Sequence, residues 1–147
     1  MVTFSGQFAI TGSHTLNNVT FDAANVNYTI ASGTTLTVNG TLTVSGAANA
    51  ALNTGNIHAK GDVSFLNGGG SNGGTATLTL NGAGTQTLTG SGTAGQGYLP
   101  NVVIDKSGGS TGKGSNAESN FLASSNSPPT GNASPDALYC TSISSNL

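Results

Sequence analysis

A two-residue alternation of threonine with apolar side chains constrains the fold of this chain more than any other feature. In GTTLTVNGTLTVSG, residues 33–46, Leu and Val take alternate positions and Thr fills the positions between them. Residues 75–90, TATLTLNGAGTQTLTG, repeat the scheme. Because successive side chains of a strand point to opposite faces, the pattern predicts strands with an apolar inner face and a threonine outer face. Asn-Gly and Ser-Gly pairs mark turns, and no 3.6-residue period indicates a helix.

Many short strands with Gly-rich corners suit either a β-sandwich or a parallel β-solenoid. Sandwiches usually contain large aromatic anchors and evenly spaced hairpins, whereas this chain has no Trp, 3 Tyr and 5 Phe. Mid-sized Val, Leu and Ile with Gly and Asn at corners suit coils stacked on one another. We therefore predict an all-β parallel β-solenoid (β-helix), with a β-sandwich as the alternative. The strands are expected near 19–21, 28–30, 35–38, 41–44, 56–58, 62–66, 76–80, 86–89 and 101–105.

An internal repeat and a change of composition predict the domain organisation. Residues 17–22, NNVTFD, match residues 100–105, PNVVID, so a long unit is expected to start again near residue 85. The solenoid repeat domain is therefore predicted over 1–106. Residues 107–147 are rich in Ser, Gly and Pro and lack the Thr-Leu-Thr alternation, which predicts a linker or irregular tail. Leu138, Tyr139 and Ile143 would supply one short closing strand.

The scarcity of charge limits the classes of partner. The chain has 3 Lys+Arg and 5 Asp+Glu, a formal net charge of −2. Nucleic acids and anionic membrane surfaces are bound by clusters of basic residues, so neither is an expected partner. No apolar run approaches the roughly 20 residues of a membrane-spanning helix. The single cysteine, Cys140, allows no intrachain disulfide.

One stretch carries a family resemblance. GTQTLTGSGTAGQGYLPNVVIDKSGG, residues 84–109, resembles a repeat unit of large bacterial secreted and cell-surface proteins, in which TQTLTGSG leads into L-x-NVVIDKSGG. Residues 33–46 are similar to the threonine–leucine coils that follow such units, and the resemblance covers residues 10–109. It implies an adhesin-like stalk or passenger domain, built as a parallel β-helix and located outside the cell or on its surface. Because MVTFSGQFAI lacks the features of a signal peptide, we expect a fragment or a missing leader.

No catalytic machinery is expected. Glycoside cleavage needs paired carboxylates and lyase chemistry on acidic sugars needs basic residues, whereas the few charges here are scattered. The densest ionisable group is His58, Lys60 and Asp62, which alternate along one predicted strand. Without a nucleophile they form no triad, and we interpret them as a solvated polar face.

No metal or cofactor is expected either. Asp22 and Asp105 each follow a predicted strand, at equivalent places in the internal repeat. We interpret them as turn-capping residues rather than calcium ligands, because Ca²⁺ needs six to eight oxygens and no acidic cluster surrounds them. His14 stands alone, which does not support a zinc site.

The sequence therefore predicts a non-enzymatic structural or adhesive repeat module, with a glycan-binding or ice-binding solenoid as the alternative. Regular Thr-x-Thr pairs on every coil would favour ice, but their uneven spacing predicts that they lie on several faces; an exposed Tyr would favour a sugar site. Open solenoid ends also predict self-association. The candidate surface-binding residues are Thr35, Thr37, Thr41, Thr43, Thr77, Thr79, Thr87, Thr89, Tyr28 and Tyr98.

Overall fold

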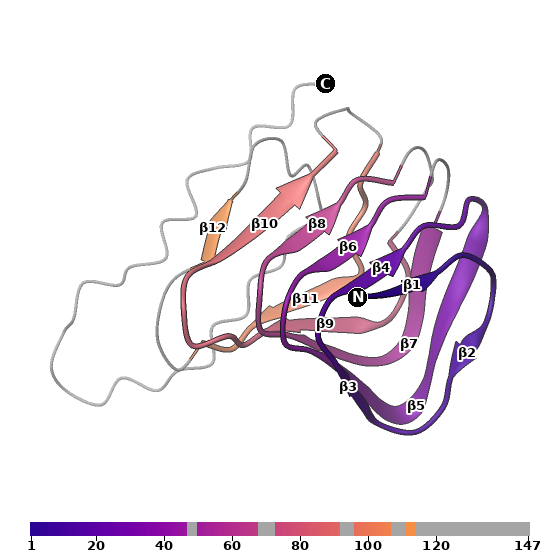
Figure 1. The fold of residues 1–147 in the computed structure, drawn as a ribbon, viewed down its shortest axis with the longest axis horizontal. Helices are drawn as coiled ribbons and strands as arrows, with labels where there is room; N and C mark the ends of the chain where they lie inside the picture. The colour runs from indigo at the N-terminus through magenta and orange to yellow at the C-terminus, as the bar shows by residue number, and fades with distance from the viewer. Residues whose placement is uncertain (47–49, 68–72, 92–95, 107–110, 114–147) are drawn as a thin grey trace, which may run out of the picture.

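Parallel strands that alternate between two sheets make up the molecule. The computed structural model describes residues 1–46, 50–67, 73–91, 96–106 and 111–113, and within these ranges every helix or strand is a β-strand. All the strand pairs are parallel. The chain coils from one sheet to the other and back, one coil above the last (Figure 1). The predicted parallel β-solenoid is confirmed, and the alternative of a β-sandwich is wrong.

Within the described residues each sheet has six strands. Sheet A is ordered β1-β4-β6-β8-β10-β12, and sheet B is ordered β11-β9-β7-β5-β2 with β3 also paired to β5. The strands of sheet A are β1 (Val2–Phe4), β4 (Val19–Phe21), β6 (Leu42–Val44), β8 (Val63–Phe65), β10 (Gln86–Gly90) and β12 (Thr111–Lys113); those of sheet B are β2 (Ala9–Ile10), β3 (His14–Leu16), β5 (Val26–Val38), β7 (Ala50–Ala59), β9 (Thr77–Leu80) and β11 (Asn101–Ile104).

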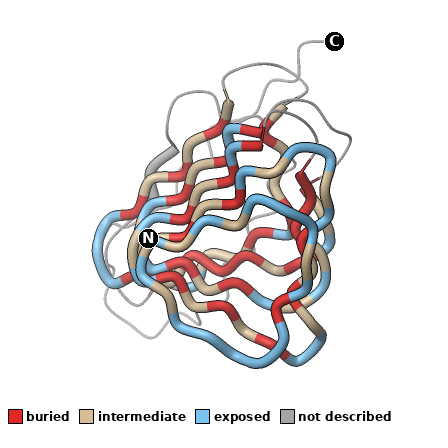
Figure 2. The backbone as a smooth tube through the Cα atoms, turned by 45° about the vertical axis from the view of Figure 1, so that its right-hand side comes forward, coloured by how far each residue is buried: buried red, intermediate tan, exposed pale blue. Residues whose placement is uncertain are grey.

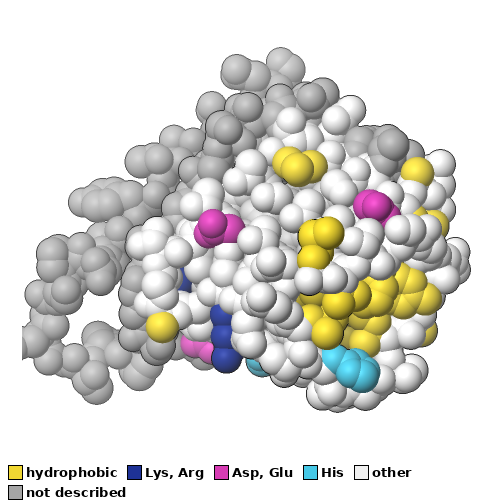
Figure 3. All heavy atoms as spheres, in the orientation of Figure 1, with side chains coloured by type: hydrophobic (Ala, Val, Ile, Leu, Met, Phe, Trp, Pro, Cys, Tyr) yellow, Lys and Arg dark blue, Asp and Glu magenta, His cyan; other side chains and the backbone are white. Residues whose placement is uncertain are grey.

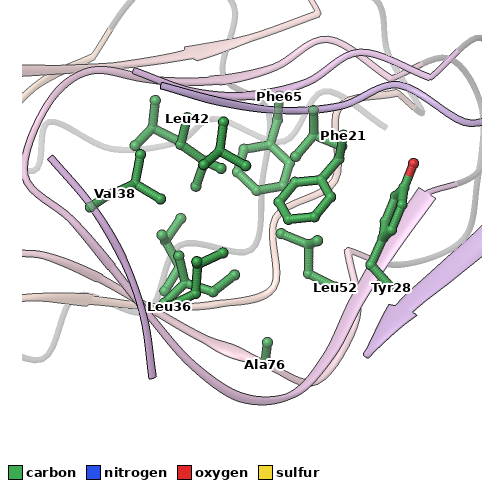
Figure 4. Packing of buried hydrophobic residues seen from close by; sticks show 14 of the residues in the cluster. Phe21, Tyr28, Leu36, Val38, Leu42, Leu52, Phe65 and Ala76 are labelled. Atoms are coloured by element: carbon green, nitrogen blue, oxygen red, sulfur yellow. The ribbon is translucent and has the colours of Figure 1, made fainter. Parts of the chain in front are cut away.

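In the core, apolar side chains of one coil stack on apolar side chains of the next. Leu36 pairs with Ile57 and Ile57 with Leu78, and all three side chains are fully buried. In Figure 2 the buried residues alternate with less buried ones along the strands, as the period of two requires. Figure 4 shows the inner side chains of the two sheets meeting between them, with Phe21 and Phe65 from sheet A near Leu52 from sheet B. The predicted apolar-in pattern is confirmed.

One corner carries glycine in three successive coils. Gly40, Gly61 and Gly82 follow the ends of β5, β7 and β9, so they occupy the same corner of successive coils. A Cβ on Gly61 would meet the carbonyl oxygen of Gly40, and one on Gly82 would meet that of Lys60. The backbones of adjacent corners approach too closely for any larger residue.

A buried glutamine holds the same corner from inside. The Gln86 side chain, 1% exposed, donates from Nε2 to the carbonyl oxygens of Ala59 (2.9 Å) and Gly61 (2.6 Å). Its Oε1 accepts from the Gly82 N–H (2.7 Å) and from Lys106 Nζ (2.9 Å). The bonds to the Gly61 carbonyl and from the Gly82 N–H satisfy backbone groups at the turn, and the bond to the Ala59 carbonyl adds to the one that this carbonyl accepts from the Asn81 N–H.

Several sequence-based boundaries need correction. The strands expected at 28–30 and 35–38 are parts of one strand, β5, whose register with β7 shifts between Ile30 and Thr35. The pattern also missed β1, β2 and β3. β12 pairs with β10, so the ladder continues into the segment expected to be irregular. The closing strand expected at 138–143 lies outside the described residues.

The internal repeat does not correspond to stacked coils. Val19–Phe21 form β4 in sheet A, whereas the matching Val102–Ile104 lie in β11 of sheet B. The residues stacked above Val19 are instead Leu42, then Val63. The repeated motif is therefore a strand that fits either sheet, and the interpretation as a structural unit starting again near residue 85 is wrong.

Candidate functional site

The outer face of sheet A carries a single file of hydroxyl groups. Register pairs place five residues in one line across successive strands. Neighbouring strands lie about 4.7–4.9 Å apart, so the hydroxyls repeat at about that spacing. The first of them is exposed and the other four are half-buried. We call this set the hydroxyl column: Thr3, Thr20, Thr43, Ser64 and Thr89.

A second line on sheet A is used partly for internal bonding. Its members are Asn18, Thr41, Asp62 and Thr87, which precede the inward residues at the start of each strand. Asn18 Oδ1 accepts a hydrogen bond from the Thr41 N–H at 2.9 Å, and Asp62 Oδ1 accepts one from the Thr87 N–H at 2.8 Å. These two side chains join successive coils, so they are less free to contact a ligand than the hydroxyl column.

The outer face of sheet B is more mixed. Thr35 aligns with Asn56 and Thr77, and Thr37 aligns with His58 and Thr79. Thr79 is only 9% exposed and has Val103 beside it on β11. The candidate threonines are thus divided, with Thr41, Thr43, Thr87 and Thr89 on sheet A and Thr35, Thr37, Thr77 and Thr79 on sheet B. The expectation that they lie on more than one face is confirmed.

Tyr28 is not a surface residue, and its assignment as an exposed sugar contact is wrong. Its side chain is 0% exposed and packs against Phe21 and Phe8, with ring centroids 4.7 and 5.4 Å away. The hydroxyl accepts from the Ala23 N–H at 2.7 Å and donates to the Phe4 carbonyl at 3.3 Å. Desolvation by burial raises the pKa of Tyr28 above its ordinary value. Because side chains alternate along a strand, Tyr28 lies on the same inward face as Ile30, and this alternation can be read from the sequence.

Tyr98 lies just before β11 and is partly exposed, so it remains available to a ligand. β11 belongs to sheet B, so Tyr98 is separated from the hydroxyl column, which lies on sheet A. The structure therefore does not bring the aromatic and hydroxyl candidates into one site.

The predicted polar group at residues 58–62 is divided by a corner. His58 points outward from β7 in sheet B, Lys60 is exposed at the turn, and Asp62 precedes β8 in sheet A. The interpretation of one shared strand face is wrong, because β7 ends at Ala59.

Lys106 is held against the corner of the coil. Its Nζ donates to the Gly84 carbonyl at 2.6 Å, and burial lowers the pKa of this lysine.

The repeated aspartates occupy different environments. Asp22 follows β4 in sheet A and Asp105 follows β11 in sheet B, so they are not equivalent positions of successive coils. Asp62 makes a carboxylate-to-backbone bond of the kind predicted for them, accepting from the Thr87 N–H. Among the described residues, no group of three or more His, Cys, Asp or Glu side chains is placed to hold a metal ion.

The geometry defines the class of molecule: a parallel β-solenoid whose outer faces present mainly hydroxyl and amide groups. In the part of the chain that the structure describes, no helix is long and apolar enough to cross a membrane. No protein-family model, curated protein or solved structure matches the chain.

Proposed function

We propose that this chain is a non-enzymatic structural and adhesive module of a secreted or cell-surface protein, and that the hydroxyl column of sheet A is its contact face. The observation that carries the proposal is the register that sets five hydroxyl-bearing residues in line across five adjacent strands. A stack of parallel strands with a continuous core resists bending, which suits a stalk.

The chemistry of the contact face favours a neutral, hydroxyl-rich partner. Threonine hydroxyls both donate and accept hydrogen bonds, and their backbone is already fixed by the ladder. A preorganised row loses little conformational entropy on binding. The resemblance of residues 84–109 to units of bacterial surface proteins supports the same class of function. A surface polysaccharide is the partner that these groups match best.

Retention of coated beads tests the adhesive function. Beads carrying the protein are washed over chitin, cellulose and mucin layers, and retention is compared with albumin-coated beads. The variant Thr20→Val/Thr43→Val/Thr89→Val removes three hydroxyls from sheet A while keeping shape and strand propensity. Its retention is expected to fall about tenfold, equivalent to ~1.4 kcal/mol.

A matched variant on sheet B provides the control. Thr35→Val/Thr37→Val/Thr77→Val makes the same three changes on the other face and is expected to leave retention unchanged. Parent beads held no better than albumin beads on all three layers would contradict the adhesive function. Equal losses in the two triple variants would contradict the assignment to sheet A.

The same column favours ice as a second candidate. An evenly repeated row of hydroxyls matches the ordered oxygens of a crystalline surface, and the ladder spacing of about 4.7–4.9 Å is uniform by construction. Inhibition of ice recrystallisation by the parent, lost in the sheet A triple variant and kept in the sheet B variant, would establish this function. Ice growth unaffected by the parent would exclude it.

A further inference from the structure

The glycine corner of the solenoid contains a residue pair that is prone to a spontaneous reaction. An asparagine followed by glycine readily forms a succinimide, because glycine has no side chain to hinder attack of its backbone nitrogen on the preceding amide. Two such pairs lie wholly within the described residues, Asn39-Gly40 and Asn81-Gly82. Strand register places them at the same corner, with one coil between them. The two pairs are therefore matched sites for the same reaction.

The N–H groups of the two glycines are held in different ways. The Gly40 N–H donates to the backbone carbonyl of Asn17, in the preceding coil, at 2.9 Å. The Gly82 N–H donates instead to a side chain, at 2.7 Å from Oε1 of Gln86. A nitrogen that donates its proton in a hydrogen bond must break that bond before it can attack a carbonyl carbon. Gly40 is thus restrained by the stacked backbone, and Gly82 is restrained by one side chain.

The amide of Asn81 has no comparable restraint on its oxygen. Its Oδ1 is buried and has no hydrogen-bond partner in the described part of the chain. The backbone N–H of Asn81 belongs to the ladder, since it donates to the Ala59 carbonyl at 3.1 Å. The hydrogen bond from Gly82 to Gln86 is therefore the contact that separates this Asn-Gly pair from its reaction.

We propose that Asn81 is a latent deamidation site and that the side chain of Gln86 suppresses the reaction by holding the Gly82 N–H. In this reaction the Gly82 nitrogen loses its proton to water and attacks Cγ of Asn81. The bond from Cγ to the side-chain nitrogen breaks, and that nitrogen leaves as ammonia with a proton from water. Water then opens the succinimide at one of its two carbonyls and leaves aspartate or isoaspartate. Water is the only co-reactant.

The reaction would damage the stacking of the coils. Isoaspartate adds a carbon to the backbone, whereas Gly82 packs so closely on the Lys60 carbonyl that even a Cβ has no room. Each event also adds a carboxylate to a chain of formal net charge −2, whose acidic and basic side chains are few on the surface in Figure 3. This inference does not depend on the adhesive function.

Peptide mapping by mass spectrometry tests the assignment, with Asn39 as a reporter in the same molecule. The parent, Gln86→Leu and Gln86→Glu are incubated in mildly alkaline buffer, and the conversion of each asparagine is followed with time. In Gln86→Leu the ratio of conversion at Asn81 to conversion at Asn39 is expected to rise at least about tenfold over the parent, because opening of the corner no longer breaks the hydrogen bonds of Gln86. Gln86→Glu keeps an oxygen that accepts from the Gly82 N–H, so its ratio should stay near that of the parent.

The ratio separates a local effect from loss of the fold. Global unfolding would accelerate both sites together, and the parent in urea gives the rate of each site without protection. The proposal is overturned if Asn81 converts as fast in the folded parent as in urea, or if the ratio in Gln86→Leu does not exceed that of the parent. Equal ratios in Gln86→Leu and Gln86→Glu would also overturn it.

Discussion

The four hydrogen bonds of Gln86 predict how far the variant Gln86→Leu is destabilised. In Gln86→Leu the side chain keeps a similar volume but loses all four hydrogen bonds. The Ala59 carbonyl still accepts from the Asn81 N–H, and Lys106 Nζ still donates to the Gly84 carbonyl. Two groups therefore lose the partner that Gln86 gave them, the Gly61 carbonyl and the Gly82 N–H. Each buried donor or acceptor left without a hydrogen bond lowers the unfolding free energy by about 1–3 kcal/mol.

The expected loss of unfolding free energy is therefore about 2–6 kcal/mol, a large share of the 5–15 kcal/mol typical of a folded domain. Urea unfolding followed by circular dichroism measures it, and the midpoint should fall while the slope stays unchanged. Thr87→Val is the control, since this half-buried neighbour points outward, and it should change stability by less than about 0.5 kcal/mol. A Gln86→Leu protein as stable as the parent would refute the assignment of Gln86 as the link between corners.

Two further predictions concern a corner glycine and a buried tyrosine. Gly61→Ala is expected to lower the unfolding free energy by about 1–3 kcal/mol, because the new Cβ meets the Gly40 carbonyl. Gly84→Ala is the control, since the space around its new Cβ is open, and it should not destabilise the protein. Equal thermal midpoints for the two variants would contradict the close approach at Gly61. Since the folded-state pKa of Tyr28 is raised above 10.0, the unfolded chain loses this proton first, so stability should fall as the pH rises above about 10. Tyr28→Phe should lose less stability than the parent protein over that alkaline range. At neutral pH the variant should be less stable than the parent by about 1 kcal/mol, because the Ala23 N–H loses its acceptor. An identical alkaline loss in both proteins would contradict the burial of this hydroxyl.

The alternation of side chains made the fold predictable, because a period of two fixes which residues face inward. Leu36, Leu42, Leu78 and Leu88 were expected inside, and all four are buried. The same rule, applied to Tyr28, would have placed it beside Ile30 in the core. Its role as a surface contact was inferred from residue type alone, and that is why it failed.

The candidate face was less predictable, because register depends on the length of every coil. Thr20 aligns with Thr43 and Thr43 with Ser64, although the connecting loops differ in length. Counting intervals along the sequence mixed residues of the two sheets. β1 and β3 were missed because strands of three residues carry too little pattern to be recognised alone.

Cross-linking of neighbouring coils tests the central claim most directly. In a Cys140→Ser background, the pair Thr43→Cys/Ser64→Cys occupies directly opposed positions of adjacent parallel strands, about 4.8 Å apart, within reach of a disulfide. The pair Thr20→Cys/Ser64→Cys lies two strands apart, about 9–10 Å, and is beyond that reach. Stacked parallel coils predict a disulfide under mild oxidation in the first pair and free thiols in the second. Free thiols in the first pair, or equal oxidation of both, would contradict the stacking.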